Sequence, residues 1–168
     1  MIMTERHLTV SRRAAASPAS LWAVLEDFPH LADVWNGLKG SEPIGTRAGG
    51  LGARRKVRLA PVGTMTETVT GWEPGRTLAT INQPSALVPF RKAKSRLVLE
   101  PDGGGTAMTF DYRYVPRGGP LGRLTGPAID RMLAKSFEDM LLAVETAARR
   151  AGITQRQDHP GSAAPGPR

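Results

Sequence analysis

The clearest hydrophobic pattern in the chain lies near its C-terminus. Between Pro127 and Arg150, apolar residues recur every three or four positions, which places them on one face of a helix. Pro127 suits the first turn of a helix, and Gly152 follows the last basic residues as a C-terminal glycine. At roughly 1.5 Å per residue, such a helix is about 33 to 36 Å long. We therefore expect it to lie against an extended surface formed by the rest of the chain.

Shorter elements precede this helix. Residues 7–14 alternate apolar and polar side chains and predict a first strand. Ser17 followed by Pro18 marks the start of a short helix, which Pro29 ends. Residues 30–38 predict a second short helix, so that the two helices form a corner.

From residue 41 to 115 the period of the pattern changes from helix to strand, with Gly and Pro at short intervals. This is typical of antiparallel strands joined by hairpins. An antiparallel sheet usually buries one face, and the C-terminal helix can cover that face. Together with the first strand, we expect a sheet of seven strands, with the other six at 41–47, 52–60, 64–72, 76–83, 91–100 and 106–115.

The turn between two of these strands sets their register. If residues 61–63 form a three-residue loop, Leu59 lies opposite Met65. Val57 then lies opposite Glu67, which places Glu67 on the apolar face of the sheet.

Two other hairpins extend this face. Asn82 is expected opposite Glu67, while Trp72 falls on the outer face, where a β-bulge or a covered edge is needed to accommodate it. In the last hairpin, Leu99 pairs with Met108 and Leu97 pairs with Phe110. The inner face of this hairpin therefore carries Met108, Phe110, Tyr112 and Tyr114.

Composition narrows the classes of function. The 168 residues, 40% of them hydrophobic, fit one domain. No apolar run is long enough to span a membrane and the N-terminus does not read as a secretory signal, so we expect a cytoplasmic protein. The absence of cysteine excludes disulfides and thiolate chemistry. The three histidines are widely separated, so we predict neither a metal site nor a cofactor.

The formal net charge of +8 suggests an acidic partner, nucleic acid or an anionic membrane. However, the basic clusters at residues 54–58 and 91–96 alternate with other residues inside predicted strands. A solvated sheet face explains most of this charge, which argues against nucleic acid as a partner.

The order of the elements, together with several local stretches, resembles a known family. These stretches are 17–22 (SPASLW) with Asp27, Phe28 and Trp35, then 45–47 (GTR), 67–69 (ETV) leading into 72–76 (WEPGR), and 102–106 (DGGGT). Over about residues 4 to 150 the chain resembles the SRPBCC group of the START-like superfamily, often described as polyketide cyclase/dehydrase and lipid-transport proteins.

The resemblance implies an α+β helix-grip fold over residues 4–151. In this fold a curved, seven-stranded antiparallel sheet (β-α-α-β6-α) wraps around the long C-terminal helix and encloses a cavity. Residues 152–168 are rich in Gly, Pro, Ser and Ala and predict a disordered tail.

The prediction of a cavity depends on this resemblance, because the residues alone favour a filled core. Across the superfamily such a cavity takes lipids, sterols, polyketides or other hydrophobic small molecules. Combined with the strand parity, the resemblance implies a set of ligand-contacting side chains without assigning a catalytic residue. They are Trp35, Arg55, Met65, Glu67, Thr80, Asn82, Leu97, Met108, Phe110, Tyr112, Met132, Ser136, Phe137 and Met140.

Glu67 has two interpretations. A carboxylate among apolar residues needs a partner, a raised pKa or water, and Arg55, diagonal to it, is the nearest candidate partner. The pair could be a half-exposed ion pair near the sheet edge. Alternatively, Glu67 could orient a ligand hydroxyl or keto group, or carry a proton.

Two connections are candidates for the cavity entrance. Residues 84–90 are apolar and lead into basic residues, so the segment 84–96 could contact an anionic membrane transiently, although packing on the open end of the domain competes with this interpretation. Residues 116–126 are rich in glycine and proline and are a candidate mobile lid.

Three classes of function follow. We favour binding or transport of a hydrophobic small molecule by a monomer or weak dimer. A polyketide aromatase/cyclase or dehydratase is the alternative, although no histidine is placed on the inner face. Its available acid–base groups are Glu67, Asp27, Arg55, Tyr112 and Tyr114. A basic interaction module for an acidic partner is the third class.

Overall fold

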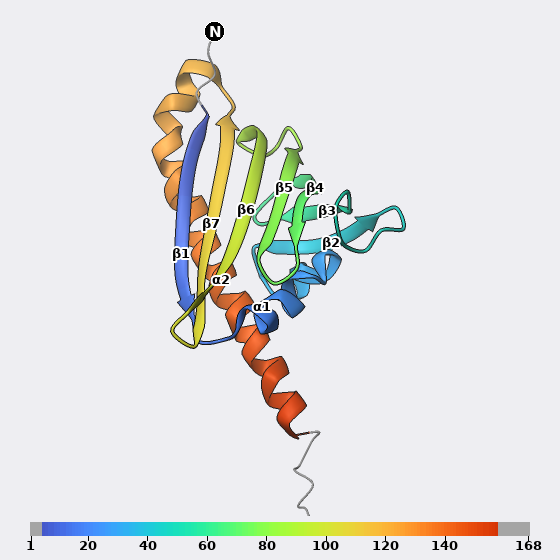
Figure 1. Ribbon diagram of the computed structural model, residues 1–168. Helices are drawn as coiled ribbons and strands as arrows, with labels where there is room; N and C mark the ends of the chain where they lie inside the picture. The colour runs from blue at the N-terminus through green and yellow to red at the C-terminus, as the bar shows by residue number, and fades with distance from the viewer. Residues whose placement is uncertain (1–4, 158–168) are drawn as a thin grey trace, which may run out of the picture.

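The structure, a computed structural model, describes residues 5–157, except for the side chains of 120–123 and 153–157 (Figure 1). Its elements follow the predicted order of one strand, two short helices, six strands and one long helix. They are β1 (Arg6–Ala14), α1 (Pro18–Leu25), the 3-10 helix η1 (Phe28–Asp33), β2 (Leu38–Ile44), β3 (Arg54–Leu59), β4 (Thr64–Glu73), β5 (Thr77–Pro84), β6 (Phe90–Asp102), β7 (Gly105–Pro116) and α2 (Gly119–Gln157).

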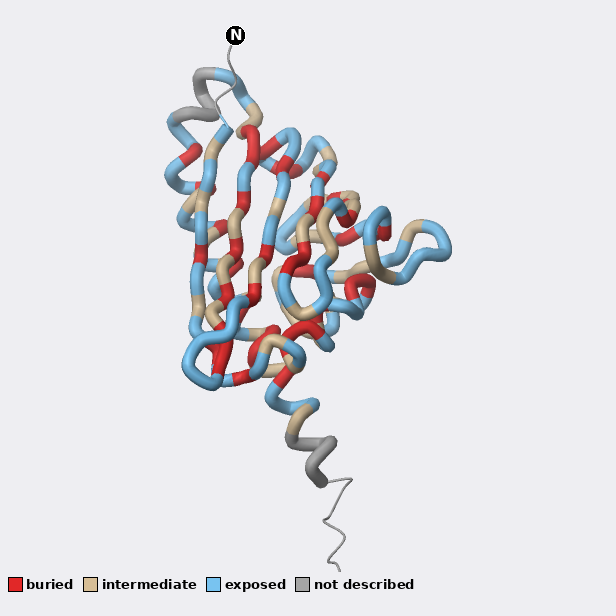
Figure 2. Tube along the Cα trace, in the orientation of Figure 1, coloured by how far each residue is buried: buried red, intermediate tan, exposed pale blue. Residues whose placement is uncertain are grey.

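All seven strands belong to one antiparallel sheet with the order β1-β7-β6-β5-β4-β3-β2. The sheet curves so that β2 and β3 cross the direction of β1 and β7, and α2 runs along its inner side (Figure 1). Buried and exposed residues alternate along the central strands, because one face packs inward and the other faces solvent (Figure 2). The predicted α+β helix-grip fold is confirmed.

The start of the chain folds as the local sequence predicts, with one correction. The Ser17 side chain accepts a hydrogen bond from the Ser20 amide at 3.2 Å and caps α1. The second helix is a 3-10 turn over Phe28–Asp33 and not a helix over residues 30–38. Proline is tolerated in the first turn of a helix, so Pro29 begins this turn and does not end the previous helix.

The long helix begins earlier and ends later than predicted. It starts at Gly119, after a turn in which Gly118 and Gly119 both have positive φ, and Pro127 lies inside it. Most of the predicted connection at residues 116–126 is therefore helical and not a loop, and its role as a mobile lid stays a prediction. At the other end the helix continues past Gly152 to Gln157, so the first residues of the predicted tail are helical. Residues 158–168 lie outside the described residues.

The β3–β4 hairpin is shifted by two residues from the predicted register. Val57 pairs with Met65, and Arg55 pairs directly with Glu67. The turn is longer than predicted, because Arg58 already pairs with Thr64. A shift of two keeps every side chain on its predicted face.

The other predicted pairings are confirmed. Asn82 lies opposite Glu67, and Leu97 and Leu99 pair with Phe110 and Met108. A bulge between Val69 and Gly71 changes the register of β4 before Trp72. Trp72 then contacts the edge of Trp22 on α1, with ring centroids 4.9 Å apart.

Candidate ligand-binding cavity

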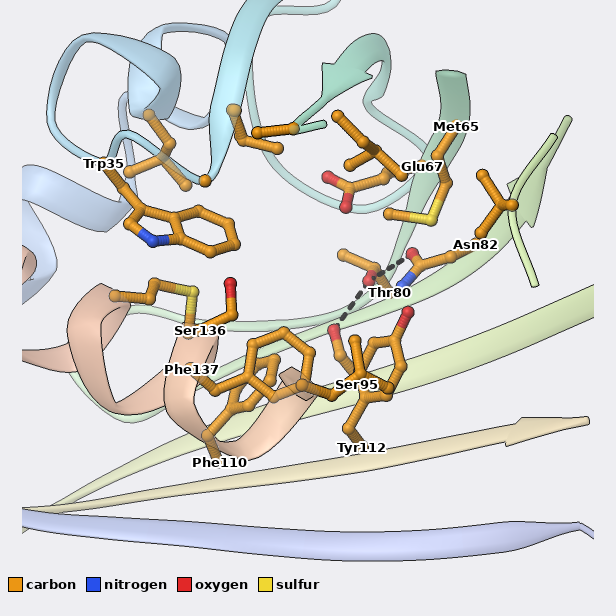
Figure 3. A pocket seen from close by; sticks show the side chains of 18 of the residues that line it. Trp35, Met65, Glu67, Thr80, Asn82, Ser95, Phe110, Tyr112, Ser136 and Phe137 are labelled. Atoms are coloured by element: carbon orange, nitrogen blue, oxygen red, sulfur yellow. Dashed lines mark hydrogen bonds between the residues drawn. The ribbon is translucent and has the colours of Figure 1, made fainter. Parts of the chain in front are cut away.

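A cavity of about 350 Å³ lies between the inner face of the sheet and α2. Side chains of η1, of strands β3 to β7 and of the middle of α2 line it, and most of them are apolar (Figure 3). Val62, Leu87 and Met132 line the cavity but are 56%, 69% and 51% exposed. These three residues, which we call the rim, therefore mark where the cavity meets solvent.

The predicted ligand-contacting residues converge on this cavity, with one exception. Met108 does not line it, because this side chain is fully buried in the core, two residues before Phe110 on β7. Strand parity identifies the inner face but does not show where along the strand packing gives way to a cavity. The predicted residues that line the cavity are Trp35, Arg55, Met65, Glu67, Thr80, Asn82, Leu97, Phe110, Tyr112, Met132, Ser136, Phe137 and Met140. Their contact with a ligand stays a prediction.

Some lining residues were missed by the sequence reasoning. Phe28, Leu31 and Leu38 belong to the helical corner and the start of β2, which close the cavity opposite α2. Ser95 on β6 also lines it. Ser95 is two residues from Leu97 on the same strand, so alternation along that strand would have placed it on the inner face.

Arg55 and Glu67 form a buried ion pair in the cavity wall. The Arg55 Nε donates to Glu67 Oε2 at 2.6 Å, and the two residues are 5% and 8% exposed. A second guanidinium nitrogen donates to the Phe28 carbonyl at 2.5 Å, and the guanidinium lies 4.2 Å from the centre of the Phe28 ring. The predicted half-exposed pair near the sheet edge is therefore wrong. The pair is directly opposed on adjacent strands, which the shifted register explains.

A row of polar side chains continues from this pair across the sheet. The Thr80 hydroxyl donates to Asn82 Oδ1 at 2.7 Å and lies 2.7 Å from Ser95 Oγ (Figure 3). Tyr112 follows on β7 and is buried. Burial raises the pKa of the Tyr112 phenol well above its usual range, and the Glu67 charge adds to this. Tyr112 therefore keeps its proton near neutral pH.

The other proposed acid–base groups lie outside the cavity. Asp27 pairs with His30 at the surface, and its carboxylate raises the pKa of that imidazole. Tyr114 donates to Asp130 on α2 at 2.7 Å. In the described part of the chain no His, Asp and Glu residues cluster as a metal site would require, and no helix is long and apolar enough to cross a membrane.

Solved structures share this fold at low sequence identity. The Zhui aromatase/cyclase from Streptomyces sp. R1128 superposes with a TM-score of 0.68 at 18% identity, covering 95% of this chain and 100% of that one. TTHA0849 from Thermus thermophilus gives a TM-score of 0.74 at 15% identity over 87% of this chain and 99% of that one. Ara h 8.0201 gives 0.68 at 13% identity over 88% and 99%. These likenesses establish the fold alone.

Sequence comparison establishes the family. No curated protein matches the chain. The family model described as "Polyketide cyclase / dehydrase and lipid transport" matches residues 5–149, which include the whole sheet and most of α2. The chain therefore belongs to the polyketide cyclase/dehydrase and lipid-transport family, a group of the SRPBCC type.

Proposed function

We propose that the protein binds or transports a hydrophobic small molecule, such as a lipid or a polyketide, in the cavity between the sheet and α2. The observation that supports this most is the cavity itself, about 350 Å³ in volume with predominantly apolar walls and an opening at the rim. Ligand pockets of proteins usually have a few hundred Å³ and a small number of polar groups. An apolar hollow of this size also costs stability, which binding of a ligand would offset.

The proposal can be tested by native mass spectrometry and by titration with the uncharged fluorescent probe N-phenyl-1-naphthylamine. We expect a copurifying ligand or a saturable rise in probe fluorescence. Met140→Trp should block the cavity and weaken probe binding at least tenfold. Leu142→Trp, on the same helix but outside the cavity and 45% exposed, is the matched control. Apo mass alone together with no probe binding would overturn the proposal.

A polyketide aromatase/cyclase or dehydratase is the second candidate. It is favoured by Glu67 and Tyr112, which place a carboxylate and a protonated phenol in one cavity. Such an enzyme would abstract a proton next to a ligand carbonyl. Exchange of the methyl hydrogens of 2-acetylnaphthalene in D₂O, followed by NMR, tests this step. Acceleration that Glu67→Gln abolishes supports catalysis, whereas exchange at the buffer rate supports binding alone.

The third class, a basic interaction module, receives less support. On the outer face, Lys94 and Arg113 both pair with Glu5, and Arg13 pairs with Asp102 at 2.7 Å. These pairs neutralise part of the charge that an acidic partner would use.

We also propose that the rim contacts an anionic membrane while ligand enters or leaves. Arg117 fastens the loop before β6 by donating to the Val88 and Phe90 carbonyls at 2.9 and 3.1 Å. Val88 is buried while its neighbour Leu87 points to solvent, so the loop presents Leu87 on a fixed support. Such a support suits insertion of a leucine among lipid chains.

Cationic side chains near the rim suit anionic head groups. Lys39 donates to the Pro61 carbonyl beside Val62. Arg91 follows the loop that carries Leu87, and Arg131 directly precedes Met132 on α2. In the described structure no carboxylate forms a salt bridge with these three side chains. Flotation with phosphatidylcholine vesicles, with and without phosphatidylglycerol, tests the contact. Leu87→Ser should abolish binding to anionic vesicles and the exposed Leu51→Ser should not, whereas absence of wild-type flotation contradicts the contact.

A further inference from the structure

The polar side chains of the cavity are concentrated on two neighbouring rows of the sheet. One row joins Arg55, Glu67 and Asn82 across β3, β4 and β5. The next row joins Thr80, Ser95 and Tyr112 across β5, β6 and β7. The remaining walls are mostly apolar, with Trp35, Phe110 and Phe137 lying on the other side of the space (Figure 3). The exception is the Ser136 hydroxyl on α2. The cavity therefore has a polar end, and the direction of each hydrogen bond there restricts what a ligand can offer.

Arg55 is already occupied by the protein. Its donors reach Glu67 and the Phe28 carbonyl, and the Phe28 ring covers its guanidinium. Among the described residues that line the cavity, Arg55 is the one cationic side chain, and Glu67 balances its charge. The cavity thus offers no net positive charge to a carboxylate or phosphate group of a ligand.

Glu67 retains an open acceptor. Its Oε2 takes the hydrogen bonds from Arg55, and no donor among the described residues reaches its other oxygen, Oε1. The carboxylate lies in the cavity wall (Figure 3). A carboxylate oxygen can only accept, so it is complemented by a ligand hydroxyl and repels a ligand anion.

The hydroxyl network leaves one donor at Tyr112. Thr80 uses its proton on Asn82 Oδ1, so Ser95 must donate to Thr80. Tyr112 lies near Asn82 in the cavity wall, and no acceptor among the described residues takes a hydrogen bond from its O–H (Figure 3). This O–H is therefore available to donate into the cavity.

We infer that the cavity selects an uncharged ligand with an apolar or aromatic body and an oxygenated end, in which a hydroxyl donates to Glu67 and a carbonyl accepts from Tyr112. Hydroxylated ketones and phenols with such an end belong to this class, and fatty acids do not. The inference rests on the proposed binding function and specifies its ligand. Leaving either buried polar group without a partner would cost affinity, which gives the site its selectivity.

Four probes with the same naphthalene body test this assignment by calorimetry or fluorescence. They are 2-methylnaphthalene, 2-naphthol, 2-acetylnaphthalene and 2-naphthoate. We expect the three uncharged probes to bind and 2-naphthoate to bind at least tenfold more weakly than 2-naphthol. Tyr112→Phe, which keeps the packing, should weaken 2-acetylnaphthalene about fivefold to tenfold and leave 2-methylnaphthalene unchanged.

Glu67→Gln is expected to change the affinities for the charged and the uncharged probes in opposite directions. It removes the negative charge beside Arg55, so 2-naphthoate should gain at least tenfold in affinity while 2-naphthol loses affinity. If this variant does not fold, the affinity of Tyr112→Phe for 2-acetylnaphthalene still tests the inference. Tight 2-naphthoate binding by the wild type, or equal binding of 2-acetylnaphthalene by Tyr112→Phe, would overturn the inference. Failure of every probe, 2-methylnaphthalene included, would instead refute the proposed binding function.

Discussion

At the scale of single residues, Arg55 and Glu67 each depend on the other. Both are buried, and removal of one partner leaves an uncompensated charge in the cavity wall. We expect Arg55→Met to lower the free energy of unfolding by about 3 to 5 kcal/mol. Urea denaturation measures this loss. The neighbouring Arg54→Met, on the exposed face of β3, should change stability by less than about 0.5 kcal/mol, and an equal loss in both variants would contradict the expectation.

A double substitution separates charge from packing at the same position. Arg55→Met combined with Glu67→Leu removes both charges and should recover most of the stability, because apolar pairs often replace buried ion pairs without cost. A double variant as unstable as Arg55→Met would show that the surrounding hydrogen bonds, such as that to the Phe28 carbonyl, matter more than the charges.

The sequence identified these residues but not their environment. Alternation along β3 and β4 was enough to place Arg55 and Glu67 on the inner face, because parity survives a shift of two residues. Their direct pairing depended on the length of the turn before Thr64, which the residues 61–63 did not reveal. Their burial depended on η1, since Phe28 covers the guanidinium from a distant part of the chain.

At the scale of elements, two carboxylates on α2 attach this helix to β1, to the residue that follows β1 and to β7. Asp130 accepts hydrogen bonds from Arg6 at 3.1 Å and from Tyr114 at 2.7 Å. Fifteen residues further along α2, Glu145 accepts from Arg12 at 2.7 Å and from the Ala15 amide at 3.1 Å. The helix is thus fixed on both sides of the segment that lines the cavity.

Loss of the Asp130 attachment should loosen one half of α2. We expect Asp130→Asn to reduce hydrogen-exchange protection of amides 129–134 about fivefold to tenfold, which corresponds to roughly 1 to 1.5 kcal/mol. Protection of amides 141–148 should not change, because Glu145 still holds that half. Asp139→Asn, at an exposed pair with Lys135, is the control. A uniform loss along α2 would show that the helix opens as one unit.

The ends of α2 illustrate what local signals leave open. Pro127 predicted a helix start because proline suits the first turn, yet the helix begins at Gly119 after two glycines with positive φ. Gly152 predicted its end, although the helix continues to Gln157. The periodic apolar face between these two residues was the reliable signal, since packing against the sheet requires it.

At the scale of the whole molecule, the same carboxylates make stability depend on pH. Hydrogen bonds from Arg6 lower the pKa of Asp130. Burial alone would raise the pKa of Glu145, but the Ala15 amide and Arg12 outweigh it and lower this pKa too. A lowered folded pKa means that stability is complete above the ordinary carboxyl pKa of about 4 and falls as the pH drops through the folded values.

We therefore expect the thermal midpoint to fall as these carboxylates become protonated in buffers below about pH 5. Asp130→Asn should lower the midpoint at neutral pH and make the acid decline shallower, because one of the titrating groups is absent. Calorimetric scans across this range measure both effects. A midpoint that rises as the pH drops below about 5 would contradict the assigned direction of these carboxylate pKa changes.

The order of elements predicted the global fold, whereas the cavity followed only from the family resemblance. The same inner-face residues could have filled a core, and Met108 does so while Phe110, two residues away, lines the cavity. The difference arises from the curvature of the sheet and the distance of α2 from it. Neither is encoded in the period of any one segment.

The cavity connects stability with function across the whole molecule, since its lining residues lose packing contacts that a filled core would provide. Ser136→Leu places an apolar side chain in this space from the cavity side of α2 (Figure 3). We expect this variant to melt higher than the wild type without ligand and to lose the rise in melting temperature that a bound ligand produces. Ser136→Ala, which leaves the space open, should keep that rise. Thermal scans with and without N-phenyl-1-naphthylamine measure all three proteins, and a Ser136→Leu protein that still gains stability from the probe would place the ligand elsewhere.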